Sequence, residues 1–374
     1  MKRYLYEPII ADLKKKMVFV TGPRQVGKTY LAKDIQKAFS KSIYLNNDDV
    51  SDTKIIHNRQ WPLNTQLVIL DEIHKMKNWK NYLKGTFDTR NENQTFLVTG
   101  SARLSTFRQT GDSLAGRYFL YRLNPLSVKE LPGLTPYEAV DALNRLGGFP
   151  EPFLSSSDDQ AQRWRQQYYT DLVREDIMDF RRINEIRSIR LLLEMLRKCV
   201  GSPLSYNSLA GDLQLAPNTV RKYIDILESL HIIFIVRPFH QNIARSILKE
   251  PKIYFYDSGY IQGDEGRRLE NTVAVCLLKN IQYLHDIKGT EQSLHYIRTK
   301  DGKEVDFAVS KDGVLTDFIE VKLSEDSLDP NLKYFKVKYP HINAIQLVHN
   351  IRHDREANNI SVLRAGNWLS QLSA

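Results

Sequence analysis

The feature that most constrains this sequence is a glycine-rich stretch that follows an apolar run. Met17–Val20 is entirely apolar and predicts a buried strand, and residues 22–29 read Gly-Pro-Arg-Gln-Val-Gly-Lys-Thr. This is the spacing of a phosphate-binding loop (P-loop), in which a strand, a tight loop and a helix start follow one another. The N-terminus of such a helix directs its positive end at an anion. The sequence therefore predicts a nucleoside triphosphate site on an α/β sheet.

Each position of the loop has an expected role. Gly22 and Gly27 let the backbone bend so that its N–H groups face the β-phosphate, and Lys28 reaches the β- and γ-phosphates. Thr29 offers its hydroxyl to Mg²⁺, which is the expected metal cofactor. The residues expected to bind the nucleotide are Gly22, Pro23, Arg24, Gln25, Val26, Gly27, Lys28 and Thr29.

An acidic pair follows a second predicted strand. Leu67–Leu70 is apolar and is followed directly by Asp71 and Glu72. In a parallel sheet this strand would end beside the P-loop. We then expect Asp71 to hold the metal and Glu72 to activate the attacking water, so that Glu72 and Lys28 are catalytic. The alternative is a helix N-terminus, where acidic residues are favoured for electrostatic reasons.

Two further segments offer groups for the same site. The predicted strand Thr95–Thr99 is followed by Gly100 and Ser101, and Thr99 or Ser101 could sense the γ-phosphate from a neighbouring strand. A plain exit from strand to loop is the alternative. Arg117 could neutralise charge on the transferring phosphoryl group. Whether Arg117 acts in its own site or in that of a neighbouring subunit, and whether the chain forms a homo-oligomer, stays open at this point.

Composition narrows the class of protein. A chain of 374 residues is long enough for about two to three domains. Cys199 and Cys276 are the only cysteines, so neither a disulfide framework nor a zinc site is expected, and a reducing cytoplasm fits. The N-terminus lacks the apolar stretch of a signal peptide, and the run Ile232–Val236 is far too short to cross a bilayer, so no membrane insertion is expected. A net charge of +9 favours anionic partners such as nucleic acid.

Strand and helix patterns alternate up to about Leu123, which predicts a parallel sheet covered by helices. Helical patterns then dominate from Ser127 to about Arg187, interrupted at Gly147–Pro150. We therefore expect a P-loop core at residues 1–125 and a helical lid or connector at 126–187. The predicted elements are Met17–Thr21, Thr29–Phe39, Ser42–Leu45, Leu67–Leu70, Asn78–Phe87, Thr95–Thr99, Tyr118–Leu123 and the helix Asp158–Arg182.

Residues 188–245 have the pattern of a winged helix. Apolar residues recur at helical spacing from Ile189, a short helix is expected at Ser205–Leu213, and a second helix at Ala216–Leu230 runs into an aliphatic strand. The second helix would present Asn218, Thr219, Arg221 and Lys222, which suit phosphate and base contacts in DNA. The alternative is a module that acts as a spacer or docks proteins.

Residues 246–374 carry a second group of charged side chains. Apolar residues alternate with Asp306 in one predicted strand and with Glu320 and Lys322 in the next. If 310–314 forms the turn, antiparallel pairing about a centre near Gly313 would place Asp306 roughly opposite Glu320. Glu270, near the start of a predicted helix at 269–278, could join them. Metal-dependent nucleases need carboxylates that hold Mg²⁺ and a lysine that orients water. The alternative is a solvated hairpin face with a weak exposed ion pair.

Together these segments resemble prokaryotic ATPases of the AAA type whose C-terminal half is a domain of unassigned function with a restriction-endonuclease-like core. The resemblance spans nearly the whole chain. It implies a multidomain α/β fold and an ATPase that binds and hydrolyses ATP with Mg²⁺. The matching pieces are Gly22–Thr29, Leu70–Glu72, Thr99–Ser101, Leu114–Arg117, Asn124–Ser127, Gly147–Pro150, Glu270–Asn271, Glu304–Asp306 and Ile319–Lys322.

The resemblance leaves three functions open. The first is an ATPase whose nucleotide state controls a C-terminal module directed at nucleic acid. The second is an ATP-gated, metal-dependent nuclease that uses Glu270, Asp306, Glu320 and Lys322. The third is a regulatory ATPase that docks protein partners and does not bind nucleic acid.

Overall fold

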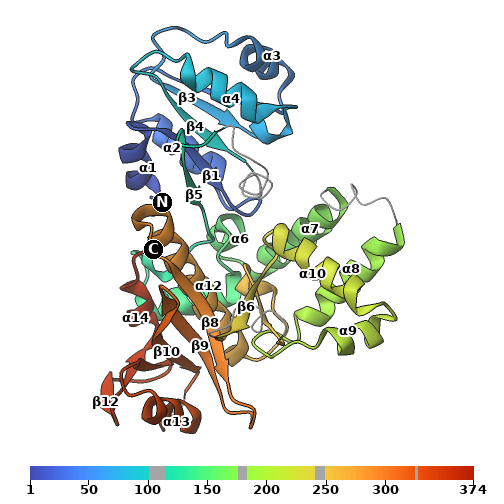
Figure 1. Ribbon diagram of the computed structural model, residues 1–374, viewed down its shortest axis with the longest axis vertical. Helices are drawn as coiled ribbons and strands as arrows, with labels where there is room; N and C mark the ends of the chain where they lie inside the picture. The colour runs from blue at the N-terminus through green and yellow to red at the C-terminus, as the bar shows by residue number, and fades with distance from the viewer. Residues whose placement is uncertain (101–113, 176–182, 241–248, 325–326) are drawn as a thin grey trace. The chain divides into compact units, whose positions relative to one another are not determined.

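The computed structural model describes residues 1–100, 114–175, 183–240, 249–324 and 327–374, which form two compact units, Met1–Asn124 and Pro125–Ala374 (Figure 1). Each unit is built on its own β-sheet, so the chain has the expected multidomain α/β fold. Within the described residues, no helix combines the length and the apolar character that crossing a membrane requires.

The N-terminal unit contains a five-stranded parallel sheet in the order β2-β3-β4-β1-β5. Its strands are β1 (Met17–Thr21), β2 (Ser42–Asn46), β3 (Leu67–Asp71), β4 (Thr95–Thr99) and β5 (Tyr118–Arg122). All the residues of β1 and β3 are buried, as their apolar sequences predict. Because the strands are parallel, the carboxyl ends of β1, β3 and β4 meet at one edge of the sheet.

The helices of this unit are α1 (Tyr6–Leu13), α2 (Lys28–Gln36), α3 (Val50–Asn58) and α4 (Trp79–Asp88). The expected helices after Thr29 and Asn78 are present, whereas α1 and α3 were not expected. A local signal for α3 exists, because the Asp49 side chain accepts hydrogen bonds from the Ser51 and Asp52 N–H groups and so caps the helix.

The C-terminal unit contains an eight-stranded mixed sheet in the order β12-β13-β11-β10-β9-β8-β6-β7. Helix α12 packs against β8 and β10 (Figure 1). The strands are β6 (Ile233–Pro238), β7 (Lys252–Phe255), β8 (Gln292–Arg298), β9 (Glu304–Lys311), β10 (Val314–Lys322), β11 (Asn343–Val348), β12 (Arg355–Ala357) and β13 (Ile360–Arg364). The helices are α5 (Pro136–Leu146), α6 (Pro150–Ser155), α7 (Asp158–Glu175), α8 (Ile183–Leu196), α9 (Tyr206–Leu213), α10 (Pro217–Ser229), α12 (Glu265–Lys288), α13 (Pro330–Lys338) and α14 (Ala365–Ser370).

The β9–β10 hairpin sets the register of the C-terminal charged residues. Its turn consists of Asp312 and Gly313 alone, so it is tighter than the expected turn at 310–314. Phe307 pairs with Ile319, and the next positions along the two strands bring Asp306 opposite Glu320, as predicted. Helix α12 is longer than the predicted 269–278 helix and is capped by Asp264, which places Glu270 in its second turn.

Two of the sequence motifs, Asn124–Ser127 and Gly147–Pro150, contribute residues with structural roles to this unit. The Lys279 ammonium on α12 is fully buried and donates to the Pro125 carbonyl at 3.0 Å, to the Ser127 hydroxyl at 2.9 Å and to the Glu130 carboxylate. The second motif begins at Gly147, whose φ of +75° suits glycine, and a Cβ atom there would lie only 1.8 Å from an Asp257 carboxylate oxygen. Through these contacts, the first motif packs against α12, and the second packs closely against Asp257.

Candidate functional site

The P-loop of the N-terminal unit is shaped by backbone contacts that only glycine permits. Gly22 has a φ of +146°, and a Cβ atom there would lie 2.2 Å from the Leu123 carbonyl oxygen. Gly27, with a φ of 97°, precedes the first residue of α2. The buried Arg3 side chain, which sequence reasoning missed, donates from Nη1 to the Val26 carbonyl at 2.7 Å. The loop backbone is therefore held at Gly22 by its close approach to Leu123 and at Val26 by the hydrogen bond from Arg3.

Lys28 is buried, and its own loop satisfies its ammonium group. The Nζ atom donates to the Gly22 carbonyl at 3.0 Å and to the Pro23 carbonyl at 2.5 Å. Burial lowers the pKa of Lys28 to about 8, although the charges of Glu72 and Asp71 act in the opposite direction. Neutral carbonyls are weaker partners for an ammonium than phosphate oxygens, so an anion in the loop can displace them.

The Asp71 carboxylate, at the end of β3, joins the strands of the site. One oxygen accepts hydrogen bonds from the Thr29 hydroxyl at 2.8 Å and the Tyr44 hydroxyl at 2.6 Å. The other accepts from the Thr99 hydroxyl and from the Glu72 N–H at 3.1 Å. Tyr44 was not predicted, because its place beside Asp71 depends on the pairing of β2 with β3. Asp71 is thus positioned by groups from four segments.

Glu72 follows Asp71 in a left-handed backbone conformation, with a φ of 55°. Its N–H also donates to the Thr99 carbonyl at 3.1 Å, which turns the chain away from the sheet. The pKa of the Glu72 carboxyl is raised by burial and then by the charge of Asp71. A raised pKa brings a carboxylate closer to the basicity that a general base needs.

Thr29 and Asp71 fit the predicted magnesium site. Their oxygen atoms already lie 2.8 Å apart at the start of α2, and hydroxyl and carboxylate oxygens are the donors that Mg²⁺ prefers. Both groups lie at the edge where the P-loop begins, so phosphate oxygens could complete the coordination. The donor set of the N-terminal unit is therefore suitable for this cofactor.

The two predicted γ-phosphate sensors have different outcomes. Thr99 is fully buried, and its hydroxyl donates to Asp71. It therefore positions the expected metal ligand, and a direct phosphate contact would require that bond to break. Ser101 lies outside the described residues.

Arg117 does not reach the P-loop of its own unit. Tyr118 pairs with Met17, so Arg117 lies at the amino end of the sheet, about 20 Å of strand away from Gly22. Its guanidinium forms a two-pronged ion pair with Asp88, at 2.7 and 3.0 Å. A role for Arg117 in its own site is therefore wrong, because the P-loop lies at the opposite edge of the parallel strands.

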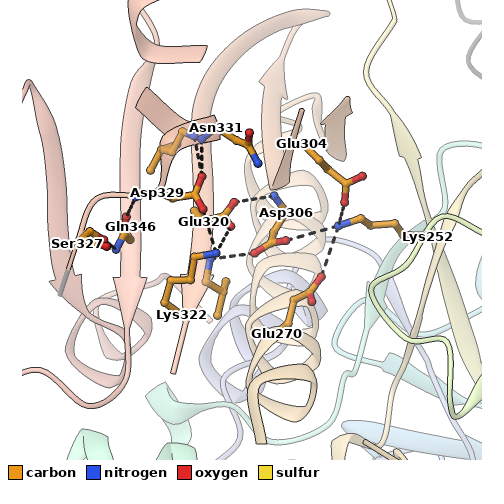
Figure 2. Close-up of polar contacts among 12 residues, drawn as sticks. Lys252, Glu270, Glu304, Asp306, Glu320, Lys322, Ser327, Asp329, Asn331 and Gln346 are labelled. Carbon is orange, nitrogen blue, oxygen red and sulfur yellow. Dashed lines mark hydrogen bonds and ion pairs between the residues drawn. The ribbon is translucent and has the colours of Figure 1, made fainter. Parts of the chain in front are cut away.

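The C-terminal unit brings together the other predicted side chains (Figure 2). The Asp306 N–H donates to Glu320 at 3.2 Å, and the Val321 N–H donates to Asp306 at 3.0 Å. The Lys322 ammonium lies 2.8 Å from Glu320 and 3.1 Å from Asp329. Burial, followed by the charge of Asp306, raises the pKa of Glu320 well above its usual range. The predicted hairpin face is therefore only partly solvated, with Glu320 buried and Asp306 and Lys322 partly exposed.

Lys252 joins this cluster, and sequence reasoning missed it together with Glu304 and Asp329. Its side chain is fully buried on β7, and Nζ lies 2.7 Å from Glu304, 3.6 Å from Glu270 and 3.6 Å from Asp306 (Figure 2). Burial alone would lower the pKa of Lys252, but these three carboxylates raise it above the usual value. The sequence did contain a signal for Lys252, because a lysine in the otherwise apolar strand Lys252–Phe255 indicates a buried charge that needs a partner.

The C-terminal carboxylates do not fit the predicted metal site. The Lys252 ammonium already lies between Glu270 and Asp306, where a divalent cation would have to bind both (Figure 2). In the described part of the chain, no three His, Cys, Asp or Glu side chains are grouped so as to hold a metal ion. Glu270, Asp306, Glu320 and Lys322 are close together, but Lys252 and Lys322 occupy the space among the carboxylates and offset part of their charge.

Comparison with known families supports an AAA-type ATPase for the N-terminal part. Residues 14–132 match a family described as an AAA domain. Residues 138–262 and 265–368 match two families described as domains of unknown function, DUF8612 and DUF4143. These matches do not identify the C-terminal half as a winged helix or an endonuclease-like domain.

Several proteins are similar to this chain over much of its length. An uncharacterized protein of Mycobacterium tuberculosis is 27% identical, over 79% of this chain and 68% of the relative. An uncharacterized protein of Haemophilus influenzae is 22% identical, over 94% of both chains. Among solved structures, a Walker-type ATPase of Pyrococcus abyssi shares 14% identity and a TM-score of 0.43, over 68% of this chain and 93% of that one.

The first prediction concerns the buried lysine of the C-terminal cluster. Replacing Lys252 by Met should destabilise the unit by about 3–5 kcal/mol, because the substitution leaves buried carboxylates without their counter-charge. Lys249, which is exposed and close in sequence, provides the matched control Lys249→Met, with an expected effect within about 0.5 kcal/mol. Calorimetric unfolding measures both variants. Equal unfolding temperatures for the two would contradict the assigned role of Lys252.

Proposed function

We propose that this chain is an ATP-hydrolysing switch of the AAA type whose nucleotide state controls its C-terminal unit. The observation that carries this proposal is the contact of the Asp71 carboxylate with the Thr29 hydroxyl at 2.8 Å, directly after the P-loop lysine. This contact supports a site in which a metal ligand, a phosphate-binding loop and the neighbouring Glu72 share one edge of the sheet. The AAA domain match over residues 14–132 supports the same activity.

In this proposal, each residue of the N-terminal site has a separate task. Lys28 exchanges the Gly22 and Pro23 carbonyls for phosphate oxygens, so its ammonium keeps hydrogen-bond acceptors when the nucleotide binds. Mg²⁺, which Thr29 and Asp71 would hold, supplies neutralisation of the phosphate charge. Glu72 accepts the proton of the attacking water. Any contribution of Arg117 is made in the site of a neighbouring subunit, which requires an oligomer.

The C-terminal part of the proposal is a module directed at nucleic acid. We retain the division into a helical lid at 126–187, a winged helix at 188–245 and an endonuclease-like domain at 246–374. Helix α10 supports it, because Asn218, Arg221 and Lys222 are exposed while Val220 and Ile224 on the other face are buried. Two exposed basic residues in the first half of such a helix suit phosphate contacts.

Metal-dependent cleavage is the second candidate function, and the pairing of Asp306 with Glu320 is the observation that favours it. The Lys252 ammonium opposes it, because it neutralises the same carboxylates. We therefore propose that the C-terminal unit binds without cutting. DNA and RNA incubated with Mn²⁺ should stay intact, and cleavage that Asp306→Ala abolishes would instead establish the nuclease.

The second prediction tests the P-loop. Lys28→Ala should reduce ATP turnover to background, because the variant loses the ammonium that leaves the Gly22 and Pro23 carbonyls for the phosphate oxygens. Lys37→Ala is the matched control, since Lys37 is exposed just beyond the same helix. Steady-state phosphate release measures both. Normal turnover by the Lys28 variant would exclude this site as the ATPase centre.

The third prediction separates binding from hydrolysis at Glu72. Glu72→Gln should retain ATP affinity and lose about 10²–10⁴-fold in turnover, which is the usual contribution of a general base. Glu92→Gln, an exposed glutamate of the same unit, should be neutral. Because burial raises the pKa of Glu72 above the ordinary 4.5, wild-type turnover should fall with acid at a pH above that value. If Glu72→Gln turned over ATP as fast as the wild type, Glu72 would not be the general base.

The fourth prediction concerns the partner of the C-terminal unit. Affinity for DNA or RNA should fall as salt rises, and Arg221→Gln with Lys222→Gln should lower the slope of log K against log salt by about two. Lys333→Gln on α13 is the control, because Lys333 is equally exposed on another helix. Affinity should also differ between the ADP state and a non-hydrolysable ATP state. Background affinity at low salt would favour the docking of proteins instead.

A further inference from the structure

The C-terminal unit contains an open cavity of about 990 Å³ that is separate from the charged cluster of Figure 2. It is lined by residues of α5, α7, α8 and α12 and by the turn Ser258–Tyr260. Five arginines and two carboxylates contribute to the described lining. They are Arg145, Arg165, Arg190, Arg197, Arg268, Asp158 and Glu194.

Three of the arginines are neutralised by carboxylates. Arg145 pairs with Asp158 at 2.8 Å, and Arg197 pairs with Glu194 at 2.6 Å. Arg165 pairs at 2.7 Å with Asp257, which is buried behind it. The remaining two, Arg190 and Arg268, have no carboxylate within ion-pair distance among the residues that the structure describes. Among the described residues that line the cavity, positive charge therefore exceeds negative charge.

The wall of the cavity is rigid before any ligand binds. The rings of Tyr169 and Tyr260 are stacked, with their centroids 3.7 Å apart. Arg197 lies over the Tyr260 ring at 3.9 Å and donates from Nε to the Tyr260 carbonyl at 2.7 Å. The Tyr260 hydroxyl in turn donates to Glu194 at 3.2 Å. A wall held in this way costs little conformational entropy when a ligand binds.

Arg268 supplies an independent indication of a ligand. Its Nε atom is enclosed, yet in the described part of the chain it has no hydrogen-bond partner. An enclosed donor without an acceptor is costly, and native structures contain few of them. The Arg268 side chain lines the cavity, so a shift of its guanidinium toward an acidic oxygen there would give Nε an acceptor, and Arg190 on α8 lines the same space.

We propose that this cavity binds a phosphate ester of nucleotide size, at a site distinct from the P-loop. Guanidinium groups bind phosphate oxygens through paired hydrogen bonds, which makes Arg190 and Arg268 the phosphate-binding pair. The volume lies at the upper end of the range for small-molecule sites. Gln162, Gln166 and Gln262 also line the cavity and can contact a sugar or base. The phosphate belongs either to a free nucleotide or to the end of a nucleic acid strand.

The fifth prediction is tested by calorimetric titration of the full chain with AMP, which lacks the phosphates that Lys28 would hold. Separate titrations use a short single-stranded oligonucleotide with a 5′-phosphate and the same strand with a 5′-hydroxyl. If AMP binds, the phosphate that the cavity recognises belongs to a free nucleotide. If only the 5′-phosphorylated strand binds, that phosphate belongs to the end of a nucleic acid strand. Lys28→Ala should leave the affinity unchanged. Arg190→Gln combined with Arg268→Gln should weaken it about a hundredfold, at about tenfold for each charged contact.

Arg163→Gln is the matched control, because Arg163 is exposed on α7 but does not line the cavity. If the double variant does not fold, Arg190→Gln alone carries the test, since Arg190 is exposed, and a loss of about tenfold is expected. Three results would overturn the proposal. They are the absence of binding by AMP and by the phosphorylated strand, equal affinity in the arginine variants, and loss of AMP binding in Lys28→Ala alone.

Discussion

The N-terminal site depends on the hydrogen bonds that the Asp71 carboxylate accepts. Thr29 from α2, Tyr44 from β2 and Thr99 from β4 all donate to this one group at the end of β3. A carboxylate that is fully hydrogen-bonded keeps one orientation. Because Thr29 is the residue after the P-loop lysine, the same contact fixes the start of α2 relative to the sheet. The expected metal ligands are thereby in place before a nucleotide binds.

The two units place a buried lysine in opposite electrostatic surroundings. Lys28 is held by two neutral carbonyls, and burial lowers its pKa to about 8. Lys252 is held by three carboxylates, which raise its pKa above the usual value. The first lysine can gain an anion, because its present partners carry no charge. The second already has its anions, and a metal would have to displace it. These surroundings favour phosphate binding in the N-terminal unit and a permanent ion cluster in the C-terminal unit.

The parts of this structure that are local in sequence could be predicted from it. The P-loop follows its strand directly, whereas the pairing of Asp306 with Glu320 also needs a bulge between Leu315 and Asp317, because the two-residue turn alone would set Asp306 opposite Ile319. The misses depend on contacts between distant segments. Lys252 meets Glu270, Glu304 and Asp306 only after β7, α12 and β9 have come together. Arg117 is different, because it directly precedes the predicted strand Tyr118–Leu123, and the predicted parallel sheet already implies that it lies at the end opposite the P-loop.

The most direct test of the central claim is a crystal structure of the chain with a non-hydrolysable ATP analogue and Mg²⁺. The account predicts that Lys28 leaves the Gly22 and Pro23 carbonyls for the phosphates, and that the Thr29 hydroxyl binds the metal with Asp71 beside it. An analogue bound elsewhere, with Lys28 still donating to those two carbonyls, would contradict the account.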